Sequence, residues 1–175
     1  MNAGQNVANQ SCKFKILMVC LDDICRSPTA HGVLEKLIQN KGLSKLIEVD
    51  SAGISTYDIG DHPDQRSIVA AEGRSYSLEE QVARQVRDND FQEFDYVLAM
   101  DVDNLHDLES AALSVCKAKV QLLLSFSNDA IESVLGSYVG DAEPGFEKVL
   151  DLVEDACQCL LEKLQRELPN AKTEQ

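Results

Sequence analysis

Four short apolar runs alternate with amphipathic stretches along the chain, and this alternation constrains the fold more than any other feature of the sequence. The runs that we predict to be strands are residues 14–20, 47–52, 96–100 and 120–126. The predicted helices are residues 28–41, 63–72, 77–86, 104–113 and 146–168, with a polar loop at 54–62 and a short turn at 91–94. Strands that alternate with helices predict right-handed crossovers and parallel pairing. We therefore expect an α/β fold with a four-stranded parallel sheet and helices on both faces.

The 175 residues fit one domain with a buried core, since 44% of them are hydrophobic and no repeat or low-complexity linker interrupts them. We expect residues 13–168 to form this domain, with polar tails at 1–12 and 169–175. No run approaches 18 apolar residues, and the first residues lack the apolar stretch of a signal peptide. We therefore expect a cytoplasmic protein whose cysteines are reduced thiols.

The chain is strongly acidic, with 16 Lys and Arg against 30 Asp and Glu and a formal net charge of −14. Such a charge disfavours non-specific binding to nucleic acid or to an anionic membrane, so we expect neither as a partner. An anionic ligand would have to be held by a local positive field. The sequence does not indicate an oligomeric state.

The segment CLDDICRSP lies between the first predicted strand and the first predicted helix. Ser27 is a suitable N-cap, and Pro28 suits the first helical position. The backbone N–H groups of residues 20–27 could surround one small tetrahedral anion, helped by the helix dipole, which would also favour the thiolate form of Cys20. Arg26 could hold two phosphate oxygens. A cysteine at a strand end is also commonly a buried small residue, so the residues alone leave both interpretations open.

The motif Cys-x5-Arg-Ser-Pro, in this position, resembles that of the low-molecular-weight protein tyrosine phosphatases. The likeness runs from about residue 13 to 168 and includes DSAG, ARQV, FDYVLAMD, the NL pair at 104–105, and GFEKVLDLVEDAC. It implies hydrolysis of phosphotyrosine in proteins, or of small aryl phosphates, through a cysteinyl-phosphate intermediate. It also implies that neither a metal nor a cofactor takes part.

The resemblance assigns roles to residues of the first loop. Cys20 matches the nucleophile, Arg26 the phosphate-binding arginine, and Ser27 the serine that hydrogen-bonds the nucleophilic sulfur. The implied phosphate-binding loop after the first strand consists of Leu21, Asp22, Asp23, Ile24, Cys25, Arg26 and Ser27.

Three further roles follow from the same resemblance. Cys25 matches a second loop cysteine that can form a disulfide with the nucleophile and shield it from irreversible oxidation. Ser51 corresponds to a serine that supports the loop. Tyr57 falls where the family keeps an aromatic wall of the substrate cleft, although an aromatic residue packs readily in many environments.

The general acid should come from the loop before the last helix. Asp141 aligns with the family's acid, which protonates the leaving phenolate and then activates water. Two departures are visible: proline does not follow this aspartate, and the segment before Gly145 is shortened. Glu143 is a nearby competitor for the role.

Asp22 and Asp23 replace the Gly-Asn pair that family members usually carry in the loop. Asp tolerates the left-handed backbone conformation, so the loop shape can survive. A carboxylate about 6 Å from the thiolate costs roughly 3 kcal/mol at an effective dielectric of about 20, and less when exposed to water. Asp23 matches the more buried asparagine. We therefore expect weaker phosphate binding and lower activity at neutral pH than Asp23→Asn would show.

Two other functions stay open at this point. Arsenate reductases use a similar fold and loop, but their chemistry needs two more cysteines in a nearby segment, and residues 74–86 contain none. The other is a catalytically impaired, phosphate-binding or regulatory protein, in which the two loop aspartates and the shortened acid loop have removed turnover.

Other motifs are weaker. Residues 101–103 read Asp-Val-Asp after a strand, but Mg²⁺-dependent phosphatases carry that motif at the first strand, and residues 101–107 lack the EF-hand pattern. The cysteines at 12, 20, 25, 116, 157 and 159 do not have zinc-ligand spacing. We expect His31, His62 and His106 to be solvated, along with the acidic face of the last helix.

Overall fold

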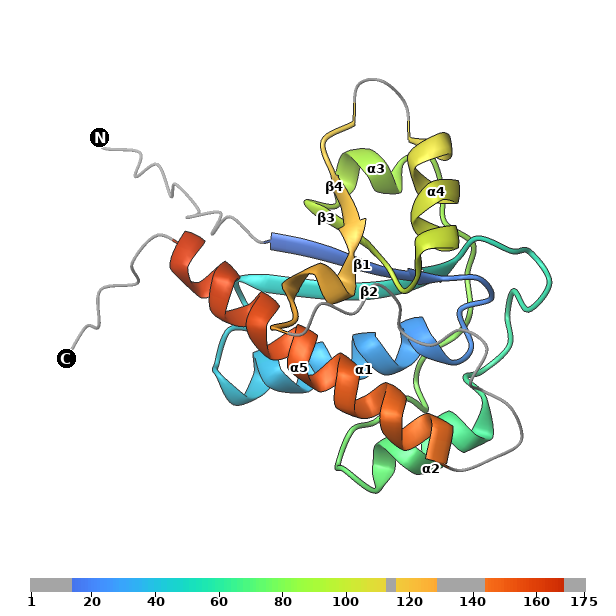
Figure 1. The fold of residues 1–175 in the computed structure, drawn as a ribbon, viewed down its shortest axis with the longest axis vertical. Helices are drawn as coiled ribbons and strands as arrows, with labels where there is room; N and C mark the ends of the chain where they lie inside the picture. Colours follow the sequence, from blue (N-terminus) through green and yellow to red (C-terminus); the bar gives the residue numbers. More distant parts are fainter. Residues whose placement is uncertain (1–13, 113–115, 129–143, 169–175) are drawn as a thin grey trace, which may run out of the picture.

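Four parallel strands form the centre of the computed structural model, which describes residues 14–112, 116–128 and 144–168 (Figure 1). The strands are β1 (Phe14–Cys20), β2 (Ile47–Gly53), β3 (Tyr96–Ala99) and β4 (Lys119–Leu122). They lie in the order β2-β1-β3-β4, and every neighbouring pair is parallel. The predicted four-stranded parallel sheet is therefore confirmed.

Helices cover both faces of this sheet. They are α1 (Arg26–Asn40), α2 (Gln65–Glu72), α3 (Asp90–Glu93), α4 (Val102–Ala111) and α5 (Pro144–Glu167), with the 3₁₀ turn η1 (Leu123–Phe126). Figure 1 shows α3 and α4 on one side of the sheet, and α1, α2 and α5 on the other. The predicted arrangement of helices on both faces is confirmed.

The apolar run of β1 supplies side chains to both faces. Ile16 and Met18 belong to the core under α1 and α5, whereas Leu17 and Val19 belong to the core under α3 and α4. All four are fully buried. Successive side chains of a strand point to opposite faces, so a strand covered on both sides needs an unbroken apolar sequence.

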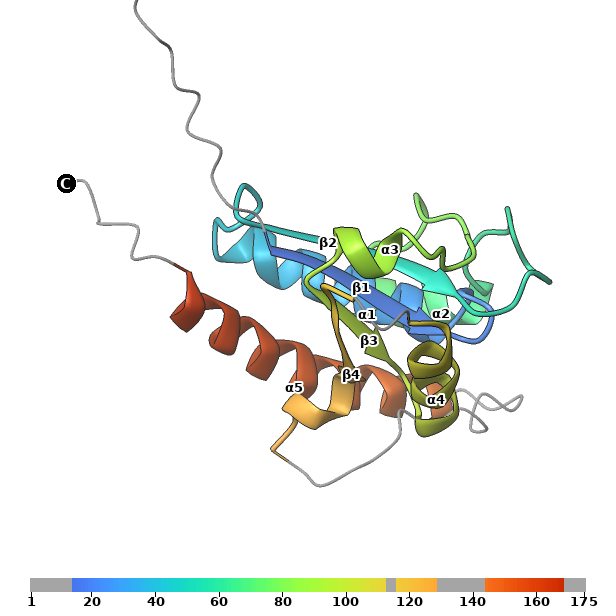
Figure 2. The same cartoon turned by 90° about the horizontal axis from the view of Figure 1, so that it is seen from above.

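The long helix α5 lies along α1, on the face of the sheet opposite α3 and α4 (Figure 2). Its buried residues recur at helical spacing: Phe146, Val149, Leu150, Val153, Ala156, Cys157, Leu160, Leu161 and Leu164. Its acidic face is not simply solvated, because the guanidinium of Arg74 bonds the carboxylates of Glu147, Asp151 and Glu154. This contact joins the end of α2 to α5.

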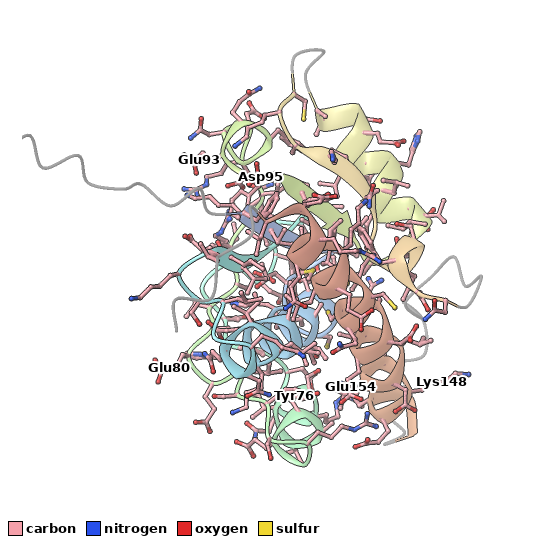
Figure 3. The ribbon with its side chains drawn as sticks, turned by 90° about the vertical axis from the view of Figure 1, so that its left-hand side faces the viewer. Tyr76, Glu80, Glu93, Asp95, Lys148 and Glu154 are labelled. Carbon is pink, nitrogen blue, oxygen red and sulfur yellow. The ribbon has the colours of Figure 1, made fainter. Side chains whose placement is uncertain are left out.

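Tyr76 strengthens the same junction. Its hydroxyl donates a hydrogen bond of 2.9 Å to Glu154, and Figure 3 shows the two side chains beside each other. Together with Arg74, this contact holds the segment after α2 against α5. Part of the acidic face therefore anchors the segment that leads back toward the β2 edge of the sheet.

The predicted helix at 77–86 is wrong, because this segment is irregular. Its backbone bonds other segments instead: the Gly53 N–H donates to the Arg84 carbonyl, and the Val86 N–H donates to the Gly53 carbonyl. These bonds, each 2.8 Å long, extend the edge of the sheet beyond β2. Tertiary contacts therefore override the helical pattern of apolar residues.

Several predicted boundaries also differ by a few residues, and two of these differences change the interpretation. The fourth strand ends at Leu122, and residues 123–126 form η1 rather than continuing the strand to Phe126. The first helix begins at Arg26 rather than at Pro28, so Ser27 lies inside it and the prediction that Ser27 is the N-cap is wrong. The Ser27 hydroxyl instead faces the loop that precedes the helix.

None of the helices in the described ranges is both long and apolar enough to cross a bilayer. Within the same ranges, no three His, Cys, Asp or Glu side chains gather as a metal-binding group.

Candidate active site

The 20–27 loop joins the carboxyl end of β1 to the start of α1, and it brings its predicted residues together as one turn. Three backbone hydrogen bonds attach it to neighbouring segments. The N–H groups of Ile54 and Ser55 donate to the carbonyls of Cys20 and Leu21, and Asp64 donates to Ile24, over 2.7–3.1 Å. The loop is therefore fixed along its length by the segment after β2.

Gly53 allows β2 to lie directly against this loop, because it pairs with Cys20 in the sheet register. A Cβ atom at position 53 would lie 2.9 Å from both the Asp22 carbonyl carbon and the Leu21 carbonyl oxygen, and 3.0 Å from the Asp23 nitrogen. Real Cβ atoms essentially never approach so closely. Glycine is required here for the close approach of two backbones.

Cys20 lies at the base of the loop and is 3% exposed. Its Sγ atom is 3.0 Å from the Ser27 hydroxyl and accepts a hydrogen bond of 3.3 Å from the Asp23 N–H. Both groups can stabilise a sulfur anion at the start of a helix. Two hydrogen-bonding groups therefore surround the Cys20 sulfur at the base of the loop.

Arg26 is the cationic side chain of the loop. Its Nη1 donates to Oδ2 of Asp101 over 2.5 Å, and both side chains are largely buried. Asp101 also caps α4, because its Oδ1 accepts a 2.7 Å hydrogen bond from the Asn104 N–H. The carboxylate therefore fixes the guanidinium at the carboxyl ends of β1 and β3.

Asp23 adopts the left-handed conformation that its position requires, with φ of 58°, and its side chain is 1% exposed. Its Oδ1 accepts a 2.7 Å hydrogen bond from the Ser27 hydroxyl, and its Oδ2 accepts a 3.3 Å bond from the Arg84 N–H. Burial raises the pKa of this carboxyl to about 6, although the hydrogen bonds from Ser27, Arg84 and Ser51 oppose the rise. The loop therefore accommodates aspartate in the left-handed conformation, with a titratable group inside it.

Ser51 lies behind Asp23 on β2, where its hydroxyl hydrogen-bonds the carboxyl. The same hydroxyl is 3.3 Å from Nδ1 of His31 and 3.5 Å from Oε1 of Gln81. Gln81 in turn donates to the Pro28 carbonyl over 3.1 Å. His31 is therefore half-buried in this network, and the expectation that it is solvated is wrong. Burial lowers its pKa, opposed by nearby Glu35 and Asp50.

Arg84 is held in place by two carboxylates. Its guanidinium donates to Asp50 and to the fully buried Asp90, with shortest distances of 2.9 Å to each. This network positions the Arg84 backbone, whose N–H contacts Asp23 and whose carbonyl accepts from Gly53. The irregular segment at 77–86 is therefore part of the support of the loop.

Cys25 points to a different environment from Cys20. It lines a small pocket between α1, α2 and α5 together with Thr29, Ser67, Ala70 and Phe146. Burial raises the pKa of its thiol to about 11. Cys25 is therefore a protonated free thiol at neutral pH.

Two predicted residues are not gathered into this arrangement. Tyr57 is 89% exposed on the loop between β2 and α2, so its packing does not identify a cleft wall. The predicted acid Asp141 and its competitor Glu143 both lie outside the described residues.

Sequence reasoning missed Asp101, which it considered only for a magnesium-dependent motif, and it missed the supporting roles of His31, Gln81 and Arg84. Asp101 carried a usable signal, because it follows directly after a predicted strand of a parallel sheet. Side chains at such carboxyl ends commonly build ligand sites. The other three supporting residues make contacts across segments that sequence periodicity does not connect.

Comparison with known proteins agrees with this fold and loop. A family model described as "Low molecular weight phosphotyrosine protein phosphatase" matches residues 15–170. The chain belongs to this family, as its motif suggested. The Homo sapiens protein of that name is 38% identical over 159 residues, which cover 90% of this chain and 99% of the relative. The Gallus gallus protein is 39% identical over 150 residues, or 85% and 94%.

Solved structures give the same result. The crystal structure of protein tyrosine phosphatase from Entamoeba histolytica, with Hepes in its active site, superposes with a TM-score of 0.84. It is 37% identical, and the match covers 89% of this chain and 99% of that one.

Proposed function

We propose that this chain hydrolyses phosphotyrosine in proteins, or a small aryl phosphate monoester, with Cys20 as the nucleophile. The observation that carries the proposal is that one short loop holds both the Cys20 sulfur, which already accepts a hydrogen bond from the Asp23 N–H, and the Arg26 guanidinium. The sulfur lies 3.0 Å from a hydroxyl, and the guanidinium is fixed by Asp101. Membership of the family supports the same chemistry.

In the first step, Cys20 Sγ attacks phosphorus, so that a sulfur–phosphorus bond forms and the bond to the aryl oxygen breaks. Arg26 and the loop N–H groups hold the phosphoryl oxygens and stabilise the charge of the transition state. Asp141 gives its proton to the departing phenolate.

In the second step, water attacks the cysteinyl phosphate and the sulfur–phosphorus bond breaks. Asp141, now a carboxylate, takes the proton from water, and inorganic phosphate leaves. The Ser27 hydroxyl donates a hydrogen bond to the departing thiolate. The cycle needs no metal or cofactor, so addition of a chelator should leave the rate unchanged.

Three residues complete the proposal. Ser51 supports the loop through Asp23, as its contact with that carboxyl suggests. Tyr57 forms one wall of the substrate cleft, where a phenyl ring of the substrate could pack on it. Cys25 reduces oxidised Cys20: its thiol displaces water from the sulfenic acid to form a disulfide. We place this reaction in the cytoplasm, where such a disulfide is reduced again.

The test is hydrolysis of an aryl phosphate from about pH 4 to 8 by the wild type, Cys20→Ser and Asp141→Asn. We expect Cys20→Ser to lose activity by at least about a thousandfold, and Asp141→Asn to lower kcat by roughly a hundredfold or more. Cys159→Ser, which changes another thiol on α5, should keep full activity. A wild type that is inert across this range would contradict the proposal and favour a phosphate-binding protein.

A further inference from the structure

The Ser27 hydroxyl has one hydrogen and two strong candidate acceptors. Its oxygen lies 2.7 Å from Oδ1 of Asp23 and 3.0 Å from Sγ of Cys20. An ionised carboxylate at the shorter distance would hold this hydrogen, leaving the sulfur without it. A carboxylic acid would instead donate to the Ser27 oxygen and free the hydrogen for the sulfur. The protonation state of Asp23 therefore decides what Ser27 can give to the thiolate.

Given the proposed function, on which this inference rests, we propose that Asp23 is a positioning residue that works as a carboxylic acid and shares a proton with Cys20 through Ser27. In the reactive form, the S–H bond of Cys20 breaks and its proton moves to the Ser27 oxygen. The Ser27 hydrogen moves at the same time to Oδ1 of Asp23. The products are a thiolate, an intact serine hydroxyl that donates to it, and a neutral acid, with no change in net charge.

The surroundings of Asp23 favour its neutral form. The side chain is 1% exposed, so the charged form loses almost all its hydration. From the segment at 77–86 it meets the backbone N–H of Arg84, whose guanidinium is already paired with Asp50 and Asp90. The cationic group is therefore neutralised by other carboxylates.

The remaining neighbours do not supply a positive charge to Asp23 either. On β2, Asp50 raises its pKa by repulsion, and Ser51 gives a neutral hydrogen bond. On α1, His31 reaches Ser51 rather than the carboxyl, and burial holds His31 toward its neutral form. Within the loop itself, the other ionisable groups are the Cys20 and Cys25 thiols, the carboxyl of Asp22 and the guanidinium of Arg26, which is paired with Asp101. This setting is consistent with the pKa near 6.

Above the pH at which both groups lose their protons, the loop carries a thiolate and a carboxylate together. Phosphate would then meet an additional buried negative charge, which Asn at position 23 would remove. The ratio of phosphate affinities of Asp23→Asn and the wild type must therefore grow with pH. A role of Asp23 in loop shape alone would give a ratio that is independent of pH.

The experiment measures alkylation of Cys20 by iodoacetamide, quantified on the Cys20 peptide, with and without inorganic phosphate. The alkylation rate as a function of pH reports how much of Cys20 is thiolate, and protection by phosphate gives the phosphate affinity, so turnover is not required. The ionisation of phosphate itself affects both proteins equally, so it cancels in the ratio of their affinities. Asp23→Asn is compared with the wild type, and Asp22→Asn is the matched control that removes the same charge from the same loop.

We expect Asp23→Asn and the wild type to bind phosphate with nearly equal affinity at about pH 5, and the variant to bind it about tenfold or more tightly at about pH 8. The alkylation rate should rise in two steps with pH in the wild type and in Asp22→Asn, but in one step in Asp23→Asn. A ratio of phosphate affinities that does not change with pH, together with a single rise of the alkylation rate in every variant, would overturn the shared proton. Such a result would still show that phosphate protects Cys20, so the proposed function would stand. Loss of phosphate protection in the wild type would overturn the proposed function itself.

Discussion

The guanidinium of Arg26 and the carboxylate of Asp101 are joined over 2.5 Å, linking the loop after β1 to the first turn of α4. The pair connects two segments 75 residues apart in the sequence. Because a guanidinium has five donors, the contact with Asp101 leaves other N–H groups for phosphate oxygens. Asp101 thus orients the cation before a substrate arrives, which lowers the cost of ordering it on binding.

Asp101→Asn should distinguish the two roles of Asp101, which are to orient Arg26 and to cap α4. Asparagine is as good an N-cap as aspartate but lacks the charge, so the cap of α4 should be kept while the ion pair with Arg26 is lost. We expect kcat/KM to fall about tenfold or more, measured with an aryl phosphate. Asp101→Ala, which also removes the cap, should lose roughly 1–2 kcal/mol of unfolding free energy in addition. An Asn variant with unchanged kcat/KM would show that the ion pair does not position Arg26.

Gly53→Ala should distort the 20–27 loop from outside it. The added Cβ would meet the backbone of Leu21, Asp22 and Asp23 within 3.0 Å, and backbone cannot move aside as a flexible side chain can. We expect a loss of roughly 1–3 kcal/mol in unfolding free energy and of at least about tenfold in kcat/KM. Gly73→Ala is the control, since its Cβ would lie 3.4 Å from the carbonyl oxygen of Ala70. Equal activity in the two variants would refute this account of Gly53.

Cys25→Ser should make oxidation of the enzyme irreversible. We expect peroxide to inactivate both proteins, and a thiol reductant to restore the wild type far more completely than the variant. The raised pKa of Cys25 keeps it a thiol at neutral pH, so it should not compete with Cys20 as a nucleophile. Mass spectrometry should find a Cys20–Cys25 disulfide in the oxidised wild type. Full recovery of the variant would contradict the role of Cys25.

Asp23 should make the folded state less stable as the pH rises. The folded chain holds this proton up to a pKa of about 6, whereas the ordinary value is 3.8, so between these values the folded state binds more protons than the unfolded state. The free energy of unfolding therefore falls as pH rises through this window, by about 3 kcal/mol in all. In urea unfolding, the free energy of unfolding of Asp23→Asn should increase relative to that of the wild type from about pH 4 to 7. A constant difference would contradict the raised pKa.

Much of this fold could be predicted from the sequence because burial on two faces leaves a strong local signal. The run at 14–20 is apolar throughout, and β1 occupies those residues. The loop that follows it was also predictable, because its Cys-x5-Arg-Ser-Pro motif is accompanied by further stretches that resemble the family between residues 13 and 168. The spacing of apolar residues in α5 likewise fixed its buried face.

The supporting contacts of the site could not be predicted in the same way. Arg84 lies in a segment with helical spacing, yet its backbone is needed by Gly53 and Asp23, so the segment is irregular. The sequence pattern places His31 on a polar helix face, but β2 brings Ser51 against it. Such contacts depend on where distant segments meet, and local periodicity contains no information about that.

The central claim is that Cys20 becomes covalently phosphorylated during turnover. Rapid acid quenching of the wild type with an aryl phosphate, followed by peptide mapping, should find phosphate on the Cys20 peptide. Cys20→Ser should show no phosphate on that peptide and no turnover. Phosphate found on another residue, or turnover that persists in Cys20→Ser, would contradict the account.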